Sequence, residues 1–144
     1  MRGLSIEMIA ESQANVCRYC EHVMIRQKQL TGIPYPRNAM TKDHLEPKVY
    51  GGQNTRENLI AACSQCNHLR GEMDADAFNN LMRKWFKRDP TLRERWHTIS
   101  RAEMNSLKRQ TLVVHERHMR GLARRWIEYA FRHFDFTFRE RRRL

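Results

Sequence analysis

Residues 63–71 read CSQCNHLRG, and their C-x-x-C spacing repeats that of residues 17–20, which read CRYC. These two pairs contain all four cysteines of the 144-residue chain. The sulfur atoms of such a pair converge on one side of a tight turn, so two pairs supply the tetrahedral thiolate set of a closed, structural zinc site. The expected ligands are Cys17, Cys20, Cys63 and Cys66. Two disulfides are the alternative, which fits less well because nothing marks the chain as secreted.

The basic residues are distributed unevenly along the chain. Residues 1–80 hold nine lysines and arginines and nine acidic residues, whereas residues 81–144 hold eighteen and seven, so the second half carries the whole net charge of +11. This asymmetry favours an anionic partner, and nucleic acid is the usual one. A basic surface kept for solubility is the alternative.

The sequence predicts no membrane association. No apolar run approaches the roughly 20 residues that a membrane span needs, and the first residues lack the core of a signal peptide. We therefore expect a cytoplasmic, reducing location.

The first half of the chain has the pattern of a small α+β unit. The expected elements are a helix over residues 4–14, a turn over 32–38, a strand over 39–44, an irregular loop over 47–58, a strand over 59–62 and a helix from Cys66.

After Gly71 the pattern becomes helical, which divides the chain into a core over residues 1–72 and a helical, basic extension over residues 73–144. Asp74 can cap a first helix, and Ser100 and Glu103 form a capping box at the start of a long one. The stripe expected on this long helix consists of Met104, Leu107, Val114, Leu122, Trp126 and Tyr129. The three tryptophans, Trp85, Trp96 and Trp126, are expected to be core anchors.

The residues between the cysteine pairs include TKDHLEP, residues 41–47, and the pair Gly51-Gly52. Because both cysteine pairs must meet at the zinc, the intervening chain folds into one unit that brings Asp43 and His44 close to Asn58 and Asn67. Carboxylate and amide oxygens are hard ligands that suit Mg²⁺ or Mn²⁺. A neutral imidazole beside such an ion can take a proton from water.

The order C-x-x-C, D-H-x-x-P, G-G, N-L and C-x-x-C-N-x-x-R-G, from Cys17 to Gly71, resembles the HNH endonuclease family and its zinc-stapled branch. The resemblance implies a ββα-metal fold. It implies that His44 is the general base and that Asn58 is a clamp, which bonds the loop backbone and keeps His44 oriented. Asp43 and Asn67 would hold the catalytic Mg²⁺ or Mn²⁺.

Two positions depart from the common pattern of the family. Asn67 stands where many members have histidine, which favours Mg²⁺ or Mn²⁺ over a transition metal. Arg70 stands where members often have lysine, and it keeps a cation that could meet a phosphate. Further candidates for phosphate contact lie in the arginine-rich runs of the extension: Arg124, Arg125 and Arg141.

The resulting interpretation is a metal-dependent HNH endonuclease that hydrolyses phosphodiester bonds of DNA, which we expect to be double-stranded. The extension would either bind the duplex or mediate self-association as a homodimer. Two alternatives stay open: a zinc-stapled nucleic-acid-binding module without catalysis, and an interaction protein whose long helix pairs with a partner. A pure binder needs none of Asp43, His44 and Asn67, so their presence together favours the enzyme.

Overall fold

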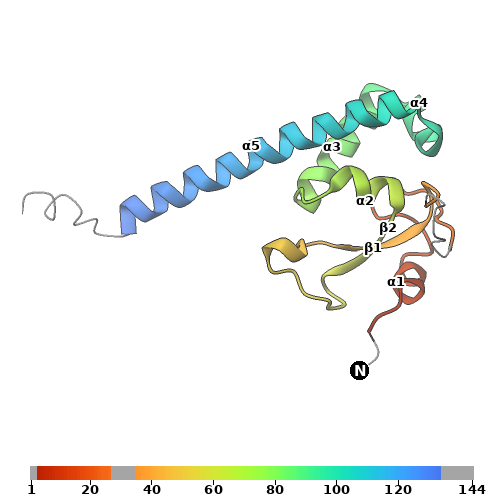
Figure 1. Ribbon diagram of the computed structural model, residues 1–144, viewed down its shortest axis with the longest axis horizontal. Helices are drawn as coiled ribbons and strands as arrows, with labels where there is room; N and C mark the ends of the chain where they lie inside the picture. The colour runs from red at the N-terminus through yellow and green to blue at the C-terminus, as the bar shows by residue number, and fades with distance from the viewer. Residues whose placement is uncertain (1–2, 27–34, 134–144) are drawn as a thin grey trace, which may run out of the picture.

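The computed structural model describes residues 3–26 and 35–133, so the expected turn over residues 32–38 lies partly outside these ranges and Arg141 lies wholly outside them. The elements follow in the order α1 (Ile6–Ser12), β1 (Met40–His44), the 3₁₀ helix η1 (Lys48–Tyr50), β2 (Leu59–Cys63), α2 (Ser64–Arg70), α3 (Ala75–Arg88), α4 (Thr91–Glu94), the 3₁₀ helix η2 (Trp96–Thr98) and α5 (Arg101–His133) (Figure 1). The expected α+β class with a helical C-terminal part is confirmed.

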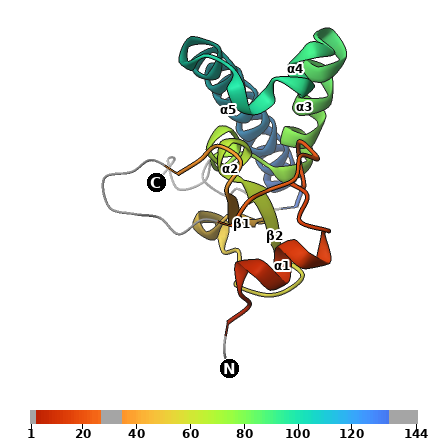
Figure 2. The ribbon, with the colours of Figure 1, turned by 90° about the vertical axis from the view of Figure 1, so that its right-hand side faces the viewer.

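The strands β1 and β2 form an antiparallel pair, in which Met40 lies opposite Cys63 and His44 lies opposite Leu59. All five residues of β2 are buried, as expected for a short apolar strand between other layers. The helix α2 begins directly after β2, so the three elements form a ββα unit. Figure 2 shows α2 between this strand pair and the helices α3 and α5.

The buried core runs from the ββα unit into the extension without a break. Its members from the extension are Phe78, Met82, Trp85, Phe86, Leu92, Trp96, Ile99, Met104 and Leu107. Trp96 is 0% exposed, and its backbone oxygen accepts a hydrogen bond of 2.7 Å from the side chain of Gln65. The division of the chain at residues 72 and 73 stays a prediction, but the hydrophobic core is common to both sides of it.

Within the described residues, the long helix α5 joins the shared hydrophobic core through its first part. There Met104, Leu107 and Thr111 are buried, and Lys108 donates to the backbone oxygens of His68 and Leu69 at the end of α2. These two bonds satisfy carbonyl groups that a helix end leaves free.

The second part of α5 corrects the sequence-based expectation, because the helix continues beyond the core (Figure 1). Trp126 was expected to be a core anchor, but it is 68% exposed. The expected apolar stripe is therefore buried near the start of α5, at Met104 and Leu107, and exposed to solvent further along, at Trp126. None of the described helices is long and apolar enough to cross a membrane.

The contrast between two tryptophans tests this fold. We expect Trp96→Ala to lower the free energy of unfolding by about 3–5 kcal/mol, because it leaves a cavity in the shared core. Trp126→Ala is the matched control and should change that energy by no more than about 0.5 kcal/mol. Urea unfolding followed by circular dichroism measures both. Equal losses for the two variants would contradict the described position of α5.

Candidate active site and metal centre

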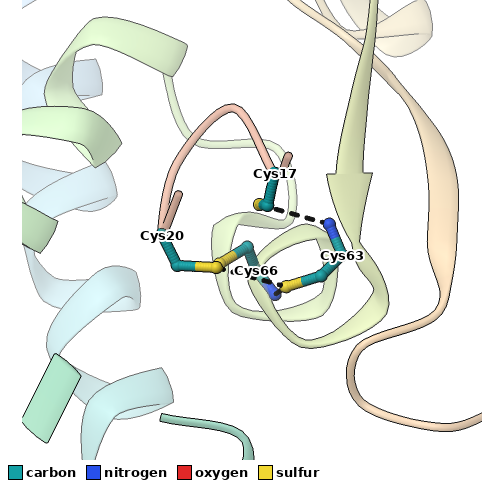
Figure 3. Close-up of side chains that lie close together, drawn as sticks. All are labelled: Cys17, Cys20, Cys63 and Cys66. Carbon is teal, nitrogen blue, oxygen red and sulfur yellow. Dashed lines mark hydrogen bonds between the residues drawn. The ribbon is translucent and has the colours of Figure 1, made fainter. Parts of the chain in front are cut away.

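The four cysteines come together in one buried cluster, although 43 residues separate Cys20 from Cys63. Their sulfur atoms all lie within 4.8 Å of one another, and all four cysteines are free (Figure 3). Cys17 and Cys20 lie in a turn after α1, whereas Cys63 ends β2 and Cys66 lies in the first turn of α2. The alternative of two disulfides is therefore not found among these four cysteines, and the cluster has the composition of the expected metal centre.

The chemistry of this cluster fits a zinc ion. Backbone N–H groups of Cys63 and Cys66 donate to the sulfurs of Cys17 and Cys63 at 3.3 and 3.4 Å, as is favourable for thiolates. Burial and the neighbouring cysteines raise the pKa of the Cys66 thiol. A set of four buried thiolates is costly without a compensating charge, and a bound divalent cation supplies it.

The extension covers this metal centre. The indole N–H of Trp96 donates to Cys66 Sγ at 3.3 Å, and His97 Nε2 lies 3.3 Å from Cys63 Sγ. Both residues belong to η2, on the far side of α3 in the sequence. The contacts tie the second cysteine pair to the helical part of the chain.

Asp43 and His44, at the end of β1, line a common open pocket of about 220 Å³. The other lining residues are Pro47, Lys48, Val49, Gly71 and Glu72. Asp43 is 6% exposed, and its Oδ2 accepts hydrogen bonds from the Tyr19 hydroxyl at 3.0 Å and from Arg70 Nη1 at 2.7 Å. Among the described residues, no hydrogen-bond partner contacts the other oxygen, Oδ1.

The imidazole of His44 is held by a side chain from the loop that follows it. His44 Nε2 lies 2.7 Å from Asn54 Oδ1. Because an amide oxygen accepts hydrogen bonds, this contact assigns the proton to Nε2 and leaves the lone pair on Nδ1. A neutral His44 in this tautomer can accept a proton through Nδ1.

Asn58 bonds the backbone of the same loop in the manner that the resemblance implies. Its Oδ1 accepts from the N–H of Glu46 at 2.7 Å, and its Nδ2 donates to the carbonyl oxygens of Glu46 and Gln53 at 3.1 and 2.9 Å. Gly52 permits this tight arrangement, since a Cβ there would lie 1.7 Å from the Glu46 oxygen. The loop between η1 and β2 is thereby closed onto the residues that follow His44.

Asn67 lies on α2 and contacts β1 rather than lining the pocket. Its Nδ2 donates to Thr41 Oγ1 at 3.0 Å and to the Lys42 oxygen at 3.2 Å. Asn67 is not among the residues that line the pocket of Asp43 and His44. Its amide oxygen has no hydrogen-bond partner among the described residues, so it remains available as a ligand.

Arg70 differs from the exposed phosphate contact that was expected, because its side chain lies in the interior. Its side chain is 0% exposed and pairs with Asp43. It also donates to the backbone oxygens of Met73, His44 and Leu45. The guanidinium therefore joins the end of α2 to the turn after β1 and cannot reach a phosphate in this position.

The remaining expected phosphate contacts lie elsewhere or outside the described residues. Arg124 and Arg125 are exposed on the second part of α5. Arg141 lies outside the described ranges. Lys48, an exposed residue of η1, lines the pocket and supplies a cation where Arg70 had been expected.

Sequence analysis missed three residues of the site: Tyr19, Asn54 and Lys48. Tyr19 and Asn54 reach Asp43 and His44 from positions 24 and 10 residues away in the chain. No local spacing or periodicity predicts such contacts. Only the two glycines and Asn58 indicated that the loop containing Asn54 folds back.

The structure thus contains a ββα unit that a four-cysteine metal centre joins to the turn after α1. A histidine and an aspartate lie together at the end of one of its strands. The model of the HNH endonuclease family matches residues 17–72, so this part of the chain is an HNH domain. No curated protein and no solved structure matches the chain. The family supports a nuclease-type function and a nucleic-acid substrate.

Loss of one cysteine tests the metal centre. We expect Cys63→Ser to lose the zinc and most of the native fold, because the binding energy of a structural zinc is folding energy. Metal analysis of the purified protein and a thermal melt measure both effects. Ser64→Ala, at the neighbouring position, is the control and should keep its zinc. A Cys63→Ser protein with full zinc content and the wild-type melting temperature would contradict the assignment.

Proposed function

We propose that the chain is a metal-dependent endonuclease that hydrolyses phosphodiester bonds of double-stranded DNA. The observation that carries this proposal is the shared pocket of Asp43 and His44, in which Asn54 holds the imidazole. The HNH family of residues 17–72 supports the same reaction class. Reducing conditions keep the four thiols available for zinc, so a cytoplasmic setting is part of the proposal.

His44 is the general base of the proposed reaction. Hydrolysis requires a water molecule in line with the scissile bond and a group that takes its proton as it attacks phosphorus. With Nε2–H donated to Asn54, the lone pair of Nδ1 is free to accept that proton. Asn58 has an indirect, positioning role in the proposed reaction. It bonds the backbone of Glu46 and thereby fixes the turn that follows His44.

Asp43 and Asn67 would hold the catalytic divalent ion. A bound Mg²⁺ or Mn²⁺ would supply Lewis acidity that offsets charge on the scissile phosphate and on the leaving 3′-oxygen. Both residues offer an oxygen that makes no hydrogen bond within the described ranges. Few protein ligands suit these ions, which keep several waters and bind substrate phosphate.

The basic surface would bind the DNA backbone. Lys48 lies at the pocket itself, and Arg124 and Arg125 lie exposed on α5. Since α5 continues beyond the core (Figure 1), it offers these arginines to a ligand longer than the pocket. Self-association of α5 into a homodimer remains a second role that the exposed apolar side chains, Trp126 among them, would serve.

Removal of the proposed base tests the enzyme directly. We expect His44→Ala to keep its zinc and its melting temperature but to nick supercoiled plasmid about 10²–10⁴-fold more slowly in Mg²⁺, the usual contribution of a positioned general base. His133→Ala, which removes an imidazole from the end of α5, is the control and should cut at the wild-type rate.

Two outcomes would contradict the proposal. Full cleavage by His44→Ala would remove His44 from the mechanism. A wild-type protein that binds the plasmid but cuts it in neither Mg²⁺ nor Mn²⁺ would favour the non-catalytic binding module.

The salt dependence of DNA binding tests the role of α5. The logarithm of the DNA association constant falls linearly with the logarithm of the salt concentration, and each phosphate that the protein neutralises makes this slope steeper by about 0.9. The double variant Arg124→Ala with Arg125→Ala should therefore make the slope shallower by about 2. Fluorescence anisotropy with a labelled duplex measures it. The double variant Arg83→Ala with Lys84→Ala removes the same charge from α3. An equal fall in both double variants would show an effect of net charge and not of contacts by α5.

A further inference from the structure

Tyr19 occupies an unusual position between the two cysteines of the first metal-binding pair. It is 5% exposed, and its backbone N–H donates to Cys17 Sγ at 3.4 Å. Its ring packs edge-on against Phe78 of α3, with 5.0 Å between the ring centroids. The metal centre therefore fixes the backbone of Tyr19, and the extension fixes its ring.

The hydroxyl of Tyr19 reaches the end of β1. It donates to Asp43 Oδ2 at 3.0 Å, across 24 residues of sequence. A phenol hydroxyl can donate a hydrogen, whereas an ionised carboxylate can only accept one. Tyr19 is therefore the donor in its bond to Asp43.

The two oxygens of Asp43 have different surroundings. Oδ2 accepts from both Tyr19 and Arg70, which uses its two lone pairs. Both hydrogen bonds to the Asp43 carboxylate from the described residues end on Oδ2 and none on Oδ1, and Asp43 lines the pocket that also holds His44. The two donors thus determine which oxygen is left for a cation.

We propose that Tyr19 is a positioning residue of the catalytic centre, which holds Asp43 from within the first zinc-binding pair. Together with Arg70 it fixes Oδ2, so that Oδ1 is presented to the catalytic divalent ion. Arg70 supplies one bond to Oδ2, and the Tyr19 hydroxyl supplies the second, so both donors are needed to engage both lone pairs of that oxygen. The inference rests on the proposed role of Asp43 as a ligand of that ion.

The arrangement also couples the two metal sites. The zinc ligands Cys17 and Cys20 flank Tyr19 in the chain, and Tyr19 contacts the proposed ligand of the catalytic ion directly. A loosened zinc site would displace the tyrosine hydroxyl and with it the preferred orientation of Asp43. The zinc would then act on catalysis through a single hydrogen bond as well as through the overall fold.

The variant Tyr19→Phe tests the inference, since it removes the hydroxyl and keeps the ring against Phe78. Partners that orient a metal ligand typically contribute 10–100-fold in affinity. We expect the dissociation constant for Mn²⁺, measured from the electron paramagnetic resonance signal of the free ion, to rise about 10-fold. The Mn²⁺ concentration for half-maximal plasmid nicking should rise in parallel, with the zinc content unchanged.

Two further variants serve as controls. Thr111→Val also removes a buried hydroxyl, whose bond ends on the Lys108 carbonyl, and it should leave Mn²⁺ binding unchanged. Asp43→Asn should weaken Mn²⁺ binding more than Tyr19→Phe does.

Mn²⁺ binding that is unchanged in Tyr19→Phe but weakened in Asp43→Asn would overturn this inference and leave the proposed function standing. A lowered melting temperature without a change in Mn²⁺ affinity would likewise reduce Tyr19 to a structural role. Unchanged binding in both Tyr19→Phe and Asp43→Asn would remove Asp43 as a ligand, and the inference would fall with it.

Discussion

The convergence of four buried cysteine sulfurs is the constraint on which the rest of the structure depends. It joins a turn after α1 to the junction of β2 and α2, and it closes the intervening chain into a loop of more than 40 residues. A core of this size is modest, and a metal staple supplies stability that the apolar residues alone do not. Between the two cysteine pairs, β1 pairs with β2 in a register that places Asp43 and His44 at the strand end.

A second group of contacts connects that strand end to the rest of the domain. The guanidinium of Arg70 donates hydrogen bonds to the Asp43 carboxylate and to the backbone oxygens of His44 and Leu45, in the turn after β1. A buried ion pair is favourable only when further hydrogen bonds satisfy its charges, and Arg70 meets that condition. An arginine can span these acceptors because its donors form a planar fork, which lysine lacks. Arginine at position 70 therefore has a structural role that lysine could not fill in the same way.

The sequence predicted the parts of the fold that depend on local patterns. The cysteine spacing predicted the metal centre, and Asp74 predicted the start of α3, which its carboxylate caps. A short apolar run predicted the strand over residues 59–62, and the turn residues on either side helped to delimit the strand over residues 39–44. Contacts that depend on the path of a loop were not predictable, and Asn54 beside His44 is the example. Trp126 shows another limit, since helical periodicity is the same whether a helix remains on the core or continues beyond it.

The central claim is that zinc closure creates a site for one hard cation at the end of β1. Anomalous diffraction from crystals of the protein with Mn²⁺ and a non-cleavable DNA duplex tests it most directly. The account predicts a manganese peak about 2.1 Å from Asp43 Oδ1 and from the Asn67 oxygen, with a separate zinc peak among the four sulfurs. A manganese ion bound elsewhere, with Asp43 contacting only Tyr19 and Arg70, would contradict it.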